Sequence, residues 1–246
     1  MKLISINIEG SMHLERVLPF IATESPDIFC LQEVYEKDLS LFAELGYTTH
    51  FLPLTQRMNH STLDTEGIAL CSREMPVHVA SHIYNGDATV IPTFDSARII
   101  DTFNNGVLHG EFSHNGDTFI IATTHFTWNP HGNIASPEQT KSLERLLAYT
   151  ATLPSHIICG DFNIPRNHNP LYDELVKKYA DTIPTTYTSS LDKTLHRHGA
   201  DADKDILFSS FMVDYIFTQP SYRASDVRLV FGTSDHAGVV GTVTKE

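Results

Sequence analysis

The sequence predicts an α+β fold in which two packed β-sheets carry helices on their outer faces. Short segments rich in β-branched and aromatic residues recur along the chain, and helical periodicity is less frequent. Some of these segments are joined by hairpin turns and others are separated by helices. Sheets that are mainly antiparallel or mixed are therefore expected. No internal repeat and no linker interrupts the pattern, so we expect one domain over residues 1–246.

The expected strands share apolar alternation or a short apolar run bounded by turn residues. Asn115-Gly116 between two of them predicts a tight hairpin, because both positions tolerate the left-handed backbone. The expected strands are 2–8, 27–34, 67–73, 98–104, 106–112, 117–126, 155–162, 211–218, 226–232 and 237–243.

Three segments have the pattern of helices: 12–23, 137–152 and a short one at 170–178. The second has the clearest start signal. Ser136 is placed as its N-cap, and Gln139 stands three residues later, which is the spacing of a capping box.

Composition limits the classes of function. The chain has 246 residues, 41% of them hydrophobic, and a formal net charge of −13. A generic nucleic-acid binder carries a basic surface, so a nucleic-acid partner is not favoured, and any such contact would be local, short or metal-bridged. The acidic excess suits a protein that collects divalent cations, although its commonest meaning is solubility.

The cysteines and the apolar runs bear on the compartment. Cys30, Cys71 and Cys159 lie inside apolar segments and have no ligand spacing, so we expect buried, reduced thiols. No signal-peptide pattern and no run long enough for a membrane helix occurs. A cytoplasmic protein without a membrane span is expected, and the sequence leaves the oligomeric state open.

Polar side chains end several of the expected strands. Asn7 follows an apolar strand, and Glu33 ends the apolar run that starts at residue 27. A carboxylate in such a place is costly unless it is paired, hydrogen-bonded or bound to a cation. For either residue taken alone, capping of the strand end is the simpler interpretation.

The stretch "HIICGDFNIP" ends a buried strand in Asp161 and Asn163. Residues two apart in extended backbone project from the same face, so the two side chains would point together. Such a carboxylate can activate a water, and the amide can bind an oxyanion. An Asx-type turn between strand and loop is the alternative, and the two interpretations are even.

Two histidines complete the set of polar strand ends. Asp235 and His236 precede the last strand and, as strand neighbours, point apart. Asp214 is an acid in a buried run and could orient His236. His125 ends another strand, with Glu66 as a candidate orienting partner.

Taken in order, these motifs resemble the endonuclease/exonuclease/phosphatase superfamily of divalent-metal phosphohydrolases. The similarity runs over residues 5 to 240, in "SINIEG", "DIFCLQEV", "EGIALCSR", "ATTHF", "IICGDFN", "VDYIF" and "SDHAGVV". It implies a four-layer α/β-sandwich that hydrolyses a phosphate ester. It also implies that Glu33 is the principal Mg²⁺ ligand, with Asn7 and Asp235 near the metal, and that Mn²⁺ can substitute.

The resemblance implies the remaining roles as well. Asp161 would position and activate the attacking water. Asn163, His125 and His236 would bind the phosphate oxygens and stabilise the developing charge. Asp214 would hold His236 in place.

By the same resemblance, Glu66 would hold His125. The physiological substrate stays open among a small phosphodiester, a nucleotide and a short RNA or DNA end. Trp128, in "HFTWNP", could stack on a base or merely pack its loop, and residues 191–199 could bind a second phosphate or have no role. A catalytically silent phospho-ligand binding protein, or a nuclease acting on polynucleotides, is the alternative.

Overall fold

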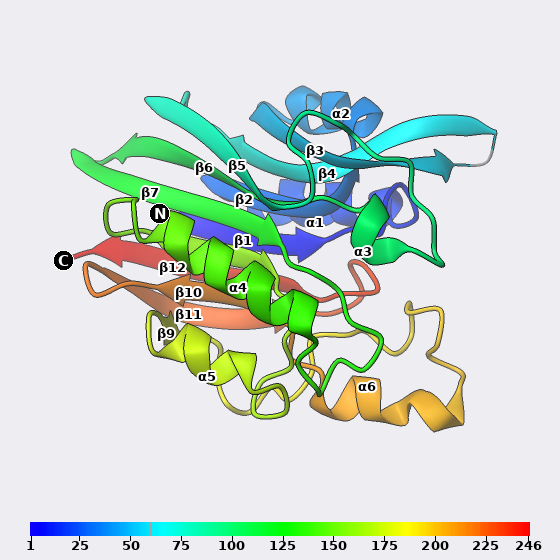
Figure 1. Cartoon of the computed structure of the whole chain (residues 1–246). Helices are drawn as coiled ribbons and strands as arrows, with labels where there is room; N and C mark the ends of the chain where they lie inside the picture. The colour runs from blue at the N-terminus through cyan, green and yellow to red at the C-terminus, as the bar shows by residue number, and fades with distance from the viewer. Residues whose placement is uncertain (60) are drawn as a thin grey trace.

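A computed structural model describes residues 1–59 and 61–246. Two six-stranded sheets pack face to face, and helices cover the outer faces (Figure 1). The four-layer α/β-sandwich predicted for the sequence is therefore confirmed.

The first sheet has the strand order β11-β12-β1-β2-β4-β3. Its pairs are antiparallel except for β1 with β2, whose parallel pairing needs the helical crossover between them. The strands are β1 (Lys2–Asn7), β2 (Ile28–Tyr35), β3 (Thr48–Asn59), β4 (Thr62–Ser72), β11 (Tyr222–Val230) and β12 (Gly238–Lys245).

The second sheet has the order β5-β6-β7-β8-β10-β9. Here β7 with β8 is the parallel pair and the remaining pairs are antiparallel. The strands are β5 (His78–Asn85), β6 (Asn105–His114), β7 (Asp117–His125), β8 (Ile157–Asp161), β9 (Ala180–Asp181) and β10 (Asp214–Thr218).

Helices cover both outer faces. Val17 of α1 (Leu14–Glu24) and Phe42 of α2 (Leu39–Glu44) are buried in an apolar cluster with β1 and β2 of the first sheet. Leu143 of α4 (Pro137–Thr150) and Leu175 of α5 (Leu171–Val176) belong to the larger core, which includes residues of both sheets. The short elements are η1 (Glu36–Asp38), α3 (Ile99–Thr102), η2 (Ala202–Lys204) and α6 (Asp205–Ser210). Figure 1 shows α3 and α6 at the end of the sandwich opposite the two termini.

Two local predictions are confirmed. The Ser136 side chain accepts the Gln139 N–H, and the Gln139 side chain in turn accepts the Ser136 N–H, so α4 begins with the predicted capping box. Asn115 and Gly116 have φ of 51° and 88°, as a tight turn between β6 and β7 requires. The three cysteines are free and buried.

One predicted strand is wrong, and three strands, β3, β5 and β9, were not predicted. Residues 98–104 contain α3, because the Asp95 carboxylate accepts the Ala97 N–H and the Thr102 hydroxyl donates to the Arg98 carbonyl, which turns the chain. The strands β3, β5 and β9 are all edge strands. Pro53 lies in β3 at a register shift, a position where an edge strand tolerates proline.

No helix in the described ranges is both long enough and apolar enough to cross a bilayer.

Gly160 provides a test of how closely β7 and β8 pack near their ends. Its φ is 142°, and a Cβ atom there would lie 1.9 Å from the Thr124 carbonyl oxygen. Gly46 also has a positive φ, 86°, but a Cβ atom there would meet nothing within 4 Å. We predict that Gly160→Ala lowers the free energy of unfolding by about 2 kcal/mol or more beyond the loss caused by Gly46→Ala. Equal losses in urea titrations of the two variants would contradict this packing.

Candidate active site

Strand register brings three of the predicted residues together. His125 is the register partner of Asp161 across β7 and β8, and Asp214 is the partner of Asp161 across β8 and β10. Register partners on neighbouring strands project from the same face of a sheet. The three side chains therefore lie together at one end of the strands β7, β8 and β10, in the middle of the second sheet.

The end of β8 is both a turn and part of this cluster. Asp161 Oδ1 accepts the Asn163 N–H at 2.9 Å, which is the Asx turn considered as an alternative. Phe162 is fully buried, and Asn163 has a left-handed φ of 51°. The turn leaves Asp161 Oδ2 for other contacts, so the two interpretations of this stretch are compatible. Asn163 Nδ2 donates to the Phe126 carbonyl at 3.0 Å.

The first sheet supplies the opposite side. Asn7 ends β1, and its amide lies 3.1 Å from Glu33 Oε1 and 3.2 Å from Asp161 Oδ2. Glu33 lies at a register shift in β2 and has a φ of 54°, a local irregularity of the strand. Asn7 thus connects the carboxylates of the two sheets.

Two imidazoles face the same carboxylate. His125 Nε2 lies 3.6 Å and His236 Nε2 lies 4.0 Å from Asp161 Oδ2. His236 Nδ1 lies 2.7 Å from Asp214 Oδ2, so the hydrogen bond expected between these residues is present. It fixes the ring and directs Nε2 toward Asp161. The Ser190 hydroxyl donates to the same Asp214 oxygen at 2.6 Å.

The prediction that Glu66 holds His125 is wrong. Glu66 instead pairs with Arg57, with Nε 2.9 Å from Oε2 and Nη2 3.2 Å from Oε1. Nη2 donates a hydrogen bond to one oxygen of the buried carboxylate, and Nε lies beside the other as an ion pair, so the guanidinium compensates the charge better than one ring nitrogen would. His125 Nδ1 is buried and has no hydrogen-bond partner within residues 1–59 and 61–246.

Burial and neighbouring charges set the protonation of the cluster. Burial alone would lower the pKa of His236, but Asp214 and Asp161 outweigh it and raise this pKa well above its usual value. Burial and the nearby Asp214 raise the pKa of Asp161. Burial would also raise the pKa of Glu33, but His125 and Arg57 hold it below its usual value. Asp161 is therefore a stronger base than an ordinary aspartate, beside a protonated imidazole.

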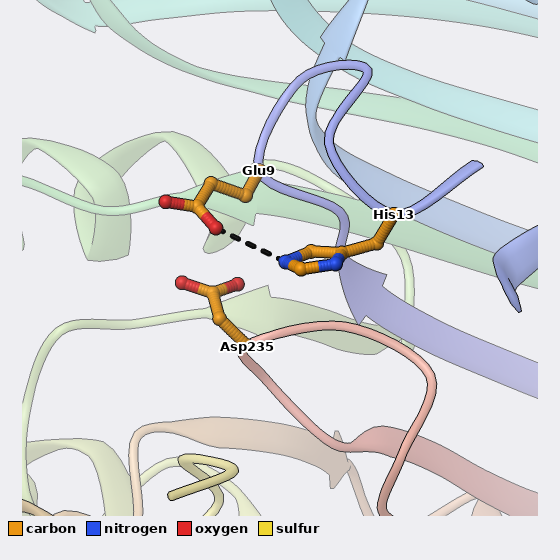
Figure 2. A group of neighbouring side chains, drawn as sticks. All are labelled: Glu9, His13 and Asp235. Atoms are coloured by element: carbon orange, nitrogen blue, oxygen red, sulfur yellow. Dashed lines mark hydrogen bonds and ion pairs between the residues drawn. The ribbon is translucent and has the colours of Figure 1, made fainter. Parts of the chain in front are cut away.

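Sequence reasoning missed Glu9 and His13, which lie beside Asp235 (Figure 2). His13 Nε2 is 3.1 Å from Glu9 Oε2, and one ligand atom from each of the three residues lies within 4.8 Å of the others. The available signal was spacing, because Glu9 stands two residues after Asn7 and His13 four residues after Glu9.

The donor set on this side fits a hard divalent cation. Burial and the neighbouring Asp235 raise the pKa of Glu9. Burial and Glu33 raise the pKa of Asp235, while His236 opposes the rise. Mutual repulsion among Glu9, Glu33 and Asp235 is the cost that a bound cation would offset.

Many of the site residues line one cleft of about 450 Å³. Glu33, Asp161, Asn163, Asp235 and His236 all line it. Its walls combine aromatic and basic side chains. Arg57 comes from the edge strand β3, and the others come from loops and short helices, which are Phe94, Phe103, Trp128, His196, Arg197, Lys204 and Phe211. The cleft is therefore open to a ligand that carries both an anionic and an apolar part.

The hydrogen bond from His236 to Asp214 can be tested directly. We predict that Asp214→Asn lowers the pKa of His236 toward or below about 6.5, because burial then acts without its main opposing charge. Because the pKa of His236 is higher in the folded than in the unfolded protein, its protonation stabilises the fold. This contribution is complete below the pKa of the unfolded state and disappears as the pH rises through the pKa of the folded state. The stability difference between wild type and variant is therefore largest below about pH 6.5. The pKa of His236 is measured by NMR titration of its ring in the metal-free protein. The control is Asp117→Asn, which replaces an aspartate of the β6–β7 hairpin and should leave the pKa of His236 unchanged. An unchanged His236 titration would contradict the assignment.

Solved structures with the same fold share little sequence with the chain. An endonuclease/exonuclease/phosphatase from Beutenbergia cavernae DSM 12333 has a TM-score of 0.74 at 16% identity, covering 100% of this chain and 71% of that one. The human Nocturnin catalytic domain with bound sulfate anion has a TM-score of 0.67 at 18% identity, with coverage of 100% and 94%.

D. rerio TDP2 complexed with single strand DNA product has a TM-score of 0.70 at 14% identity, with coverage of 100% and 99%. Comparison with curated proteins gives no match. The model of the Endonuclease/Exonuclease/phosphatase family matches residues 4–236, and the chain therefore belongs to that family.

Proposed function

We propose that this protein is a divalent-metal-dependent phosphoesterase in which Asp161 activates the attacking water. The observation that carries the proposal is the position of Asp161 Oδ2, which accepts a hydrogen bond from the Asn7 amide and takes no part in the Asx turn. It has a raised pKa and faces His125 and His236 at the floor of an open cleft. A carboxylate with a raised pKa beside two hydrogen-bond donors suits a general base in ester hydrolysis.

Glu33, Asp235 and Glu9 would hold the metal, with the Asn7 side chain beside them. An all-oxygen carboxylate set suits Mg²⁺ and accepts Mn²⁺, and the neighbouring His13 is compatible with Mn²⁺. When bound, the cation would polarise a phosphoryl oxygen and neutralise developing charge.

The side chains divide the reaction between them. Asp161 Oδ2 takes a proton from the water as it attacks phosphorus in line with the leaving oxygen. His236, held protonated by Asp214, donates from Nε2 to a phosphoryl oxygen, and His125 donates to another. Asn163 Nδ2 bonds to Phe126 through one hydrogen and keeps its second for the same phosphate.

A polynucleotide end is the second candidate substrate. Trp128 is 42% exposed and lines the cleft, which favours stacking on a base over packing of its own loop. TDP2 in the similar solved structure holds single strand DNA product. The net charge of −13 opposes binding of long polynucleotides, so a short end or a nucleotide fits better.

We predict that Asp161→Ala and His236→Ala each lower kcat on bis(p-nitrophenyl) phosphate by about 100-fold or more. The same loss should follow addition of EDTA and be reversed by Mg²⁺ or Mn²⁺. Asp117→Ala and His114→Ala in the β6–β7 hairpin are matched controls outside the cleft, and they should keep wild-type activity.

Activity that survives either site substitution, or survives EDTA, would refute this mechanism. A wild-type protein that binds phosphate but turns over no ester would instead support the silent-binder alternative.

Trp128→Ala separates the two substrate classes. If a base stacks on the indole, the substitution raises KM for a short oligonucleotide about tenfold. It leaves KM for p-nitrophenyl phosphate, tested in the same buffer, within about twofold because the smaller ester does not reach the indole. Equal KM values for wild type and variant on the oligonucleotide would contradict stacking.

A further inference from the structure

Arg57 is held rigidly at the edge of the cleft. Its guanidinium pairs through Nε and Nη2 with the two oxygens of Glu66. Its central carbon lies 3.9 Å from the centre of the Phe94 ring, which places the charge over the aromatic face. An arginine fixed by both contacts loses little further rotamer freedom on binding a ligand.

The geometry leaves one edge of this guanidinium free. The Arg57 side chain is 31% exposed, whereas that of Glu66 is 1% exposed. Within residues 1–59 and 61–246, Nη1 has no hydrogen-bond partner, and Arg57 lines the cleft together with Glu33. The remaining N–H donors therefore lie where a substrate would sit.

A purely structural role explains this ion pair less well. A buried ion pair contributes little net stability compared with apolar residues of similar size. Here the carboxylate is buried and the cation is partly open to the cleft, so the carboxylate serves to aim the cation. Among the other basic side chains of the cleft, His196 is neutral near pH 7, because burial and nearby positive charges lower its pKa to about 4.

We propose that Arg57 binds a phosphate oxygen of the substrate on the Glu33 side of the cleft, and that Glu66 and Phe94 position it. This inference rests on the proposed phosphoesterase function. Guanidinium donors match phosphate oxygens in geometry and charge. The oxygen belongs either to the reacting phosphate or to a second phosphate beside it, and two probes distinguish these sources.

The test measures binding, which does not require turnover. Dissociation constants for inorganic phosphate and for methylene diphosphonate are measured calorimetrically at a fixed Mg²⁺ concentration. We expect Arg57→Gln to weaken binding about tenfold. An effect on both probes places the oxygen on the reacting phosphate, and an effect on the diphosphonate alone places it on a second phosphate.

A double-mutant cycle tests the positioning role of Glu66. Glu66→Gln alone should weaken binding, but it should change affinity less than about twofold when added to Arg57→Gln, since its effect passes through Arg57. Arg57→Lys keeps the charge and loses the fork, so its affinity should be intermediate. The matched control is Arg228→Gln with Glu24→Gln, an arginine–glutamate pair outside the cleft lining in which Arg228 Nη2 contacts both carboxylate oxygens.

Wild-type affinity in Arg57→Gln would overturn the proposal, as would absence of binding by the wild type. An equal effect of Glu66→Gln in both backgrounds would overturn the positioning role. Arg57-dependent binding by a protein that hydrolyses no phosphate ester would refute the proposed function and leave the Arg57 site intact.

Discussion

The pairing of β7, β8 and β10 at His125, Asp161 and Asp214 is the constraint on which the candidate site depends. A slip of one residue in either pair would turn a side chain to the opposite face of the sheet. The apolar residues of these three strands belong to the buried core, so the packing of the core opposes such a slip. The stability of the fold and the alignment of the polar groups thus have the same origin.

Charge is arranged across the cleft in a consistent way. Carboxylates of both sheets gather on its floor, where burial and mutual repulsion keep the pKa values of Asp161 and Asp235 high. Positive groups stand around them, His236 on Asp214 and Arg57 on Glu66. Each positive group is held by a buried carboxylate, so its direction is set before any ligand arrives.

The sequence predicted the polar strand ends because each one interrupts an apolar run, as Asp161 does after Ile157 and Ile158. It could not identify the partner of Glu66. Arg57 lies in an edge strand whose proline and polar residues do not give the apolar pattern of a strand, so this strand was not predicted. It also placed a strand at 98–104, where side-chain hydrogen bonds to the backbone turn an apolar stretch into α3. The apolar pattern of the sequence predicted which segments are buried, but it could not predict which side chains pair with one another.

The Asn7–Asp161 hydrogen bond joins positions 154 residues apart. Asn7 belongs to the first sheet and Asp161 to the second, so this bond forms only when the two sheets dock. A folding intermediate with either sheet formed alone would have an apolar face and half of the polar cluster, but no cleft. Recovery of phosphate binding during refolding would therefore report the docking of the two sheets, whereas circular dichroism would report the formation of strand structure.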